Sequence, residues 1–443
     1  MNVYIESLGC FKNKADTEKL VNTLVQYNIE IVNDPTISNF IIINTCGFIK
    51  PAVEESIDRI LELAKYKERG AKLIAFGCMI ERYKEKIINT IPELDFAAGV
   101  NSFEDIINFL LEQSESNVGN KSIDKNKYIF TNLPYYSYVK IADGCNNRCS
   151  YCTIPFIKGD IKSVKIEDIK KAVQKLVTTG VKEINIIAQD ITKYGIDIYG
   201  EYKLCTLLEN ILHIDSEFYI RLLYLNPDGI DEKLIDLIKN SNNIIKYLDI
   251  PIQHASDNIL KRMNRKIDSY GLYKLFERIR EKLPDLIIRT TIIVGFPGED
   301  DKDFNKLLDF LNTFTPEWVG FFRYYPEEGT PSYNFKGRIN RKIISERLNI
   351  LERLQIENIN KKFKTYINKN VKVFIERPLE KSDYRDHLIT NDYTYMGRTL
   401  LQAPEIDGKC YIKVNNNIAI KNFGPYNSTI NDFQYPNIFV TLC

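Results

Sequence analysis

The 443-residue chain lacks long apolar runs: the longest, such as 40–43, have the length of a strand. Because a helix needs ~18 apolar residues to cross a bilayer, we expect no membrane segment. The chain also lacks an excess of either charge, with 60 Lys and Arg against 59 Asp and Glu. This balance excludes nucleic-acid binding driven by bulk positive charge, although it leaves room for a local basic patch.

The first 20 residues lack an apolar segment of signal-peptide length and carry Glu6, Asp16 and Glu18. We therefore expect no secretory signal and a cytoplasmic location. Because cytosolic thiols are kept reduced, the nine cysteines are not expected to form disulfides. They need another explanation.

Three apolar runs in the first hundred residues each stop at a cysteine. VYIESLGC, NFIIINTC and AKLIAFGC end at Cys10, Cys46 and Cys78, and helix-like stretches follow at 15–27, 51–66 and 81–91. Strands that alternate with helices predict a parallel sheet, whose strands share one carboxyl edge. The three thiols can converge there on a metal cluster, or each can be a small buried apolar residue. An adjacent glycine at each cysteine favours the cluster, because glycine lets the backbone approach a bulky group.

A second series of strand–helix units follows. Strands are predicted at 138–141, 183–188, 219–223, 247–251, 287–294 and 318–322, with helices at 166–179, 233–240, 269–282 and 301–314. This alternation predicts a parallel sheet that curls into an open barrel. The fold class is thus α/β, with a small all-β module after it.

The composition along the chain predicts four segments. Residues 1–115 form the N-terminal α/β domain, 116–134 a polar linker, 135–368 the barrel with a charged helical connector at 338–366, and 369–443 the small β-barrel. Strands of this last module are expected within 371–379, 387–398, 409–414 and 437–442.

Cys145, Cys149 and Cys152 form a C-x3-C-x2-C triplet in a single loop. Iron–sulfur clusters are held by cysteine thiolates, normally four, so three leave one iron open to another ligand. A zinc site is the alternative, but zinc normally takes four closed ligands, and no fourth Cys or His lies near in sequence. The triplet therefore indicates a 4Fe-4S cluster. Cys205, Cys410 and Cys443 have no partners and are interpreted as ordinary thiols.

The triplet with Tyr151 before its last cysteine resembles the signature of the radical S-adenosylmethionine (SAM) enzymes. The order of the three modules resembles the methylthiotransferases, whose last module is a TRAM-type barrel. The strings SLGCFKN, KIADGCNNRCSYCTIPFIKG, NIIAQDITKYG, YLDIPIQHASD, RTTIIVGFPGE and GRTLLQAPEIDG narrow the resemblance to the RimO-type enzymes. Phe11, Asp160 and Val164 depart from the usual text of that family.

The resemblance implies a radical SAM methylthiotransferase that acts on an aspartate of ribosomal protein S-twelve of the small subunit. It implies two 4Fe-4S clusters, one on Cys145, Cys149 and Cys152 with SAM, and an auxiliary one on Cys10, Cys46 and Cys78. A radical cofactor is needed because the β-carbon hydrogen of aspartate is not acidic. It also implies a reductant such as flavodoxin or ferredoxin, and RNA contact only through the ribosome.

The SAM pocket is expected to be lined by Tyr151, Gln189, Gln253 and Arg289. Tyr151 would pack beside the adenine or only shield the cluster, and Arg289 would bind a carboxylate or form a structural ion pair. His254 is interpreted as a structural histidine, so no acid–base catalyst is predicted.

The sister enzymes that methylthiolate adenosine in tRNA share the cluster cysteines and are the alternative. Residues 371–443 hold eight Lys and Arg against eight Asp and Glu. A module that grips tRNA phosphates is expected to carry surplus positive charge, so neutrality favours the protein substrate.

Overall fold

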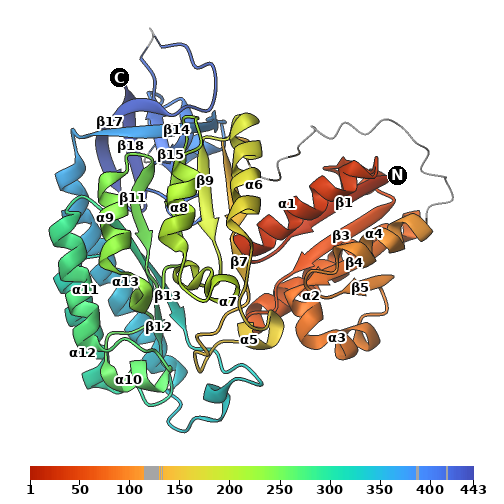
Figure 1. The fold of residues 1–443 in the computed structure, drawn as a ribbon, viewed down its shortest axis with the longest axis horizontal. Coiled ribbons are helices and arrows are strands. Elements are labelled where there is room, and N and C mark those ends of the chain that lie inside the picture. Colours follow the sequence, from red (N-terminus) through yellow and green to blue (C-terminus); the bar gives the residue numbers. More distant parts are fainter. Residues whose placement is uncertain (114–128, 130, 132, 386–388, 416–417) are drawn as a thin grey trace.

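The computed structural model describes residues 1–443 apart from 114–128, 130, 132, 386–388 and 416–417. Most of the predicted linker, 116–134, lies outside the described residues. Two large parallel sheets are followed by a small closed barrel (Figure 1). Among the described helices, none combines the length and the apolar character needed to cross a membrane.

The N-terminal sheet has the order β2-β1-β3-β4-β5, and all its pairs are parallel. Its strands are β1 (Asn2–Ser7), β2 (Glu30–Val32), β3 (Phe40–Thr45), β4 (Lys72–Gly77) and β5 (Phe96–Ala98). The helices are α1 (Phe11–Gln26), α2 (Lys50–Ala64), α3 (Cys78–Thr90) and α4 (Phe103–Glu112).

Helices cover both faces of this sheet, which explains why its central strands are continuously apolar. In β3, Ile42 packs in the cluster that holds residues of α1 and α4. Its neighbours Ile41 and Ile43 point the other way, into the cluster with residues of α2 and α3. Side chains of a strand alternate between faces, so one isoleucine run serves two cores.

The second sheet has the order β13-β12-β11-β10-β9-β6 and is parallel throughout. Its strands are β6 (Tyr136–Lys140), β9 (Glu183–Ile187), β10 (Tyr219–Leu222), β11 (Ile244–Asp249), β12 (Ile287–Val294) and β13 (Trp318–Arg323). In the part of the chain that the structure describes, the terminal strands β6 and β13 do not pair, so the barrel is partial. The predicted α/β fold with a partial barrel is confirmed.

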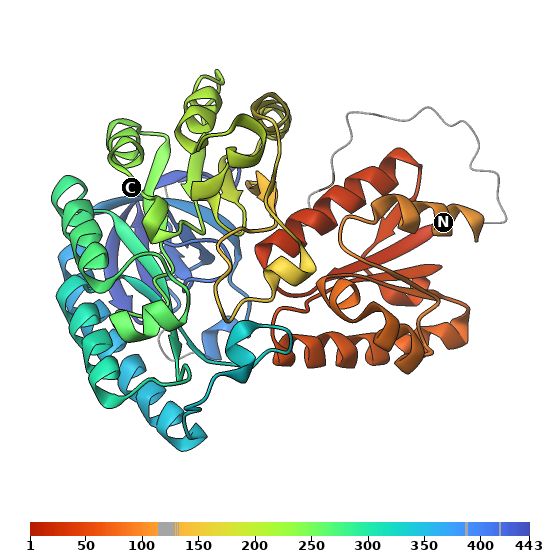
Figure 2. The same ribbon diagram turned by 60° about the horizontal axis from the view of Figure 1, so that its bottom comes forward.

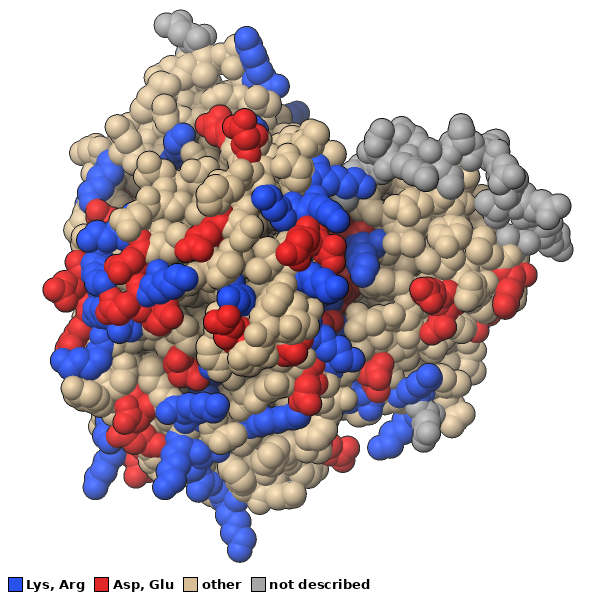
Figure 3. Space-filling view, viewed as in Figure 1, with Lys and Arg blue, Asp and Glu red and all other residues tan. Residues whose placement is uncertain are grey.

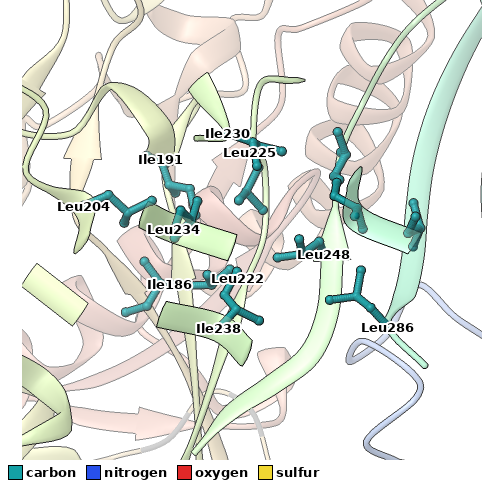
Figure 4. Packing of buried hydrophobic residues seen from close by; sticks show 14 of the residues in the cluster. Ile186, Ile191, Leu204, Leu222, Leu225, Ile230, Leu234, Ile238, Leu248 and Leu286 are labelled. Atoms are coloured by element: carbon teal, nitrogen blue, oxygen red, sulfur yellow. The ribbon is translucent and has the colours of Figure 1, made fainter. Parts of the chain in front are cut away.

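Helices pack on the outside of the partial barrel. They are α6 (Ile166–Thr178), α8 (Leu204–Leu212), α9 (Glu232–Asn240), α10 (Asp257–Arg262), α11 (Ser269–Lys282), α12 (Asp301–Phe314) and α13 (Arg341–Phe363), with the short α5 (Ile154–Ile157) and α7 (Ile196–Tyr199) in loops. Figure 4 shows Ile186, Leu222 and Leu248 of adjacent strands packed beside Leu234 and Ile238 of α9. A two-stranded ribbon, β7 (Ala142–Asp143) with β8 (Lys162–Ser163), precedes α6.

The C-terminal module is a closed five-stranded barrel of order β14-β15-β16-β18-β17. Its strands are β14 (Asn370–Pro378), β15 (Tyr395–Thr399), β16 (Cys410–Lys413), β17 (Tyr426–Gln434) and β18 (Asn437–Leu442). Residues 387 and 388 of the strand expected along 387–398 lie outside the described residues, and of the remainder only 395–398 belong to β15, so the expectation is wrong in extent. β17 was not predicted: its inward positions include the polar Ser428 beside Ile430, so the apolar alternation that marks a strand is missing.

The C-terminal barrel docks at the amino ends of the strands of the partial barrel (Figure 1). Glu183, at the start of β9, lies between two arginines, 2.7 Å from Arg221 Nε and 2.6 Å from Arg398 Nη2. All three side chains are buried. Because Arg398 comes from β15, this triad joins the two modules.

We expect Glu183→Gln to lower the free energy of unfolding by about 3 kcal/mol or more, because two buried guanidinium groups lose their counter-charge. The midpoint of denaturant unfolding measures this. Asp392→Asn is the control, since Asp392 and its partner Lys413 are exposed and such pairs contribute little. Equal midpoints for the two variants would contradict a structural role for the triad.

Candidate functional site

The loop of Cys145, Cys149 and Cys152 lies between β7 and α5 and is held by backbone contacts. Gly144 has a φ of +74°, and a Cβ there would overlap the carbonyl oxygen of Asp160. The amide of Cys145 donates to the Gly159 carbonyl (3.1 Å), and the amide of Cys152 donates to the Cys149 carbonyl (3.1 Å). The loop is therefore turned on itself and presents its three thiols together.

Burial, with a smaller contribution from the neighbouring Cys149, raises the pKa of Cys145 to about 11 and that of Cys152 to about 12. Buried thiols of this kind stay protonated unless a cation or a metal supplies opposite charge. The chemistry of this donor set fits an iron–sulfur cluster, because the cluster binds thiolates and supplies that charge.

Cys10, Cys46 and Cys78 follow β1, β3 and β4, which are neighbours in the N-terminal sheet. Gly9 has a φ of +85°, and a Cβ there would lie 2.8 Å from Cys46 Sγ. A Cβ on Gly47 would lie 2.7 Å from the backbone of Cys78. The three cysteine segments thus touch one another, and glycine is required where they do.

Asn13 connects the three segments. Its Nδ2 donates to the carbonyls of Leu8 (2.9 Å) and Thr45 (3.1 Å), and Cys78 Sγ donates to its Oδ1 (3.7 Å). Burial raises the pKa of Cys46 to about 11 and that of Cys78 to about 12, with nearby Cys10 adding to both. This set therefore has the same chemical character as the first.

A single metal ion does not suit either set. Among the described residues, no three Cys, His, Asp or Glu side chains stand close enough to share one ion. Zinc would need such closeness, because its bonds to sulfur are about 2.3 Å long. In a 4Fe-4S cluster each thiolate binds a different iron, so the sulfurs stand farther apart.

Figure 2 shows the N-terminal domain beside the partial barrel, and direct contacts across this boundary join the segments that carry the two cysteine sets. Thr153, next to Cys152, donates from Oγ1 to the carbonyl of Phe48, two residues after Cys46 (3.0 Å). Phe11, next to Cys10, stacks on Tyr138 of β6 with ring centroids 4.7 Å apart. Direct contacts thus connect the loops of both sets.

Ion pairs hold this contact. Lys158 Nζ lies 3.3 Å from Asp16 of α1 and 3.2 Å from Asp143 of β7, and Lys140 pairs with the same two carboxylates. On the far side of the contact, Arg82 of α3 pairs with Glu327 at 2.9 Å, both buried. Although burial alone would raise the pKa of Asp143, Lys140 and Lys158 hold it well below its usual value.

Unpartnered polar atoms lie at the carboxyl ends of the barrel strands. Gln189 donates from Nε2 to Asp143 Oδ1 (2.8 Å), but its buried Oε1 has no partner among the described residues. Gln253 Oε1 and Asn226 Oδ1 are also buried and have no hydrogen-bond partner among the described residues. Because buried polar atoms are normally hydrogen-bonded, these three indicate a polar ligand. Asn226 was not predicted from the sequence.

Gln253 has a φ of +69°, which is rare for a residue with a side chain. Its amide donates to the Thr291 carbonyl, and its carbonyl accepts from the Ile293 amide, both at 2.8 Å. These bonds to β12 hold the strained backbone, a combination that is common at binding sites.

The structure places Tyr151 against Phe296, with the rings edge to face and their centroids 6.4 Å apart. Arg289 lies farther inside the barrel, 3.3 Å from Asp249 and 3.5 Å from Asp407 of the C-terminal module. This geometry favours the structural ion pair, the alternative that the sequence left open for Arg289. A role of either residue toward SAM remains a prediction.

Arg265 was also missed by the sequence analysis. Its Nη1 lies 4.0 Å from Cys149 Sγ, and its Nη2 donates to the Pro251 carbonyl (2.9 Å). No spacing or motif connects it to the triplet, because the contact arises only from the fold.

The comparisons with known proteins identify the family of this chain. Residues 139–311 match the model of the radical SAM superfamily, and 2–99 match an uncharacterized protein family, UPF0004. The ribosomal protein uS12 methylthiotransferase RimO of Acetivibrio thermocellus is 42% identical, over 92% of this chain and 91% of that protein. The RimO of Aquifex aeolicus is 40% identical, over 94% and 92%. This chain belongs to the RimO family.

The predicted resemblance and the predicted class, a radical SAM methylthiotransferase, are thereby confirmed. Membership of the RimO family also favours the main prediction over a tRNA methylthiotransferase. The radical SAM superfamily uses SAM and a 4Fe-4S cluster. Among solved structures, the radical SAM methyltransferase TsrM of Kitasatospora setae has a TM-score of 0.54 at 13% identity, over 75% of this chain and 74% of that one, a likeness of fold alone.

The departures from the RimO text have local explanations. Phe11 gains the stack on Tyr138 described above. Asp160 pairs with Arg148 on the surface. Val164 contributes only backbone bonds, its amide to the Ile141 carbonyl (2.9 Å) and its carbonyl from the Tyr194 hydroxyl (2.6 Å).

His254 is buried beside this site, and its Nε2 has no hydrogen-bond partner among the described residues. Its Nδ1 accepts from the Ser256 amide (3.0 Å), and its Nε2 is 3.8 Å from Glu299. Burial lowers the pKa of His254 to about 3 from an ordinary value of 6.5. The folded protein therefore keeps this imidazole neutral at any pH at which the enzyme is expected to work.

This histidine predicts a pH dependence of stability. Below pH 6.5 the unfolded chain binds a proton that the folded chain does not take up until the pH approaches 3. Stability is thus intact above pH 6.5 and falls below it, and we expect His254→Gln to reduce that fall. Denaturation midpoints across this range measure it, with exposed His213→Gln as control. Identical slopes for wild type and His254→Gln would contradict the assignment.

Proposed function

We propose that this chain inserts a methylthio group at the β-carbon of an aspartate of ribosomal protein uS12, in the cytoplasm, with electrons from a flavodoxin or ferredoxin. The observation that carries the proposal is the meeting of two three-cysteine sets at one domain contact, in a chain of the RimO family. Two sets are what such a reaction needs, because the radical and the sulfur must reach the same carbon.

We propose that Cys145, Cys149 and Cys152 would hold a 4Fe-4S cluster together with SAM, and that Cys10, Cys46 and Cys78 would hold a second, auxiliary cluster. When bound, SAM and the clusters supply the radical chemistry and the sulfur. The polypeptide contributes position: Asn13 aligns the N-terminal thiols, and the Asp143 network keeps the two sets facing each other. Gln189, Asn226 and Gln253 offer unpaired oxygens to the amino and hydroxyl groups of SAM.

The C-terminal barrel supports a protein substrate. Residues 371–443 carry no net charge, with eight basic and eight acidic residues. On the face shown in Figure 3, basic and acidic side chains are interspersed. tRNA recognition would require a concentration of positive charge.

The proposal is tested by incubating the anaerobically reconstituted protein with uS12, SAM, a sulfide source and a reductant. We expect the mass of the target aspartate to rise by the difference between SCH3 and H. If uS12 stays unmodified in this assay and tRNA from a deletion strain lacks a methylthio nucleoside, the tRNA alternative holds instead.

The cysteine assignment predicts iron content. The wild-type protein should bind about eight iron atoms, and Cys149→Ala and Cys46→Ala about half as many. Cys149→Ala should lose production of 5′-deoxyadenosine from SAM, whereas Cys46→Ala should keep it but form no methylthio product. Cys205→Ala is the matched control and should behave as wild type. Full iron content in either cluster variant would refute the ligand set.

Gln253 gives a separate prediction for SAM binding. In Gln253→Asn the new residue tolerates the positive φ, but its side chain is one methylene group shorter, so the amide oxygen no longer reaches the same point. We expect the KM for SAM to rise about tenfold, the effect of losing one buried hydrogen bond. Gln174→Asn, on the exposed face of α6, should leave it unchanged. An unaltered KM in Gln253→Asn would remove this residue from the pocket.

A further inference from the structure

Lys12 of α1 reaches from the N-terminal domain to the mouth of the partial barrel. Its Nζ lies 3.4 Å from the ring centroid of Tyr224, just after β10. Its charge acts on both cysteine sets, because it opposes the burial that raises the pKa of Cys46 and of Cys152. Lys12 therefore lies where the two sets meet.

Tyr224 is held in an unusual backbone conformation beneath this lysine. Its φ is +64°, which costs free energy for a bulky side chain. Its amide donates to Asp249 Oδ2 (3.2 Å), and its carbonyl accepts from the Ile191 amide (3.1 Å). These bonds hold the aromatic ring under the ammonium group.

Three other basic side chains near the junction pair with carboxylates, whereas Arg265 contacts Cys149 Sγ and the Pro251 carbonyl. Lys140 and Lys158 pair with Asp16 and Asp143, and Arg289 pairs with Asp249 and Asp407. By contrast, in the described part of the chain no carboxylate oxygen lies within 4.0 Å of Lys12 Nζ, although Asp249 is near enough to act on its charge. An aromatic face compensates an ammonium only in part, so the charge of this half-buried cation is incompletely balanced.

The substrate offers a matching anion. The carbon to be modified in an aspartate side chain is bonded directly to its carboxylate carbon. A cation that binds the carboxylate therefore also fixes the position of the reacting β-carbon, which is one bond away from the carboxylate carbon. An adenine base carries no such negative charge, so a lysine at this point discriminates between the two substrate classes.

We infer that Lys12 binds the carboxylate of the substrate aspartate and thereby positions its β-carbon between the two cysteine sets. The inference rests on the proposed function and makes Lys12 a positioning residue that selects an acidic side chain. It predicts that wild-type enzyme prefers uS12 with aspartate at the modified position over uS12 with asparagine there.

The test uses reconstituted full-length enzyme with both forms of uS12. For Lys12→Met we expect the KM for aspartate-bearing uS12 to rise about tenfold or more, the effect of losing a charge-assisted hydrogen bond, and the preference over asparagine to disappear. Lys12→Arg keeps the charge and should keep the preference.

Lys19→Met is the matched control, because Lys19 is on the same helix and faces an aromatic ring, Phe103, but is exposed. An unchanged KM and preference in Lys12→Met would overturn the inference while leaving the proposed function intact. If Lys12→Met loses iron, the test uses wild type and Lys12→Arg. An equal KM of either enzyme for the aspartate and asparagine forms of uS12 would then overturn the inference. Failure of wild type to modify uS12 at all would instead refute the proposed function.

Discussion

The site depends on one electrostatic contact, in which two lysines and two aspartates join the N-terminal domain to the partial barrel. Asp16 belongs to the helix that begins beside Cys10, and Asp143 lies two residues before Cys145. Lys140 and Lys158 of the partial barrel pair with both carboxylates. Because a buried charge needs an opposite charge beside it, Asp16 can be buried only when the two domains are in contact. The same contact orients Gln189, which donates to Asp143. A shift of this network would move both cysteine sets relative to each other.

The thiols themselves give the fold little stability. They are small, and burial raises the pKa of Cys46, Cys78, Cys145 and Cys152, which keeps these four neutral in the bare polypeptide. Hydrogen bonds from neighbours place them instead: Asn13 for the N-terminal set and the turned backbone around Gly144 for the other. The polypeptide therefore forms the N-terminal cradle from ordinary sheet-edge geometry, in which adjacent parallel strands end side by side, and the other cradle from a single turned loop.

Much of this arrangement could be predicted because it is written in local patterns. Strand-like runs that end at Cys10, Cys46 and Cys78 predicted neighbouring strands, and the alternation after residue 135 predicted the barrel. β17 was missed because Ser428 occupies an inward position. Lys12, Asn226 and Arg265 were missed because their roles arise from segments that are distant in sequence. Arg289 shows the same limit, since one of its partners, Asp407, belongs to another module.

The loop between β15 and β16 has a further consequence. It carries Asp407, which accepts from the Tyr247 hydroxyl (2.7 Å) and pairs with Arg289, and Glu405, which accepts from the Tyr136 hydroxyl (2.8 Å) and pairs with Lys14. The C-terminal barrel therefore contributes charged side chains to the interior of the partial barrel in addition to covering its end. A foreign module grafted in its place would have to supply both carboxylates, or Lys14 would lose its partner and Arg289 one of its two.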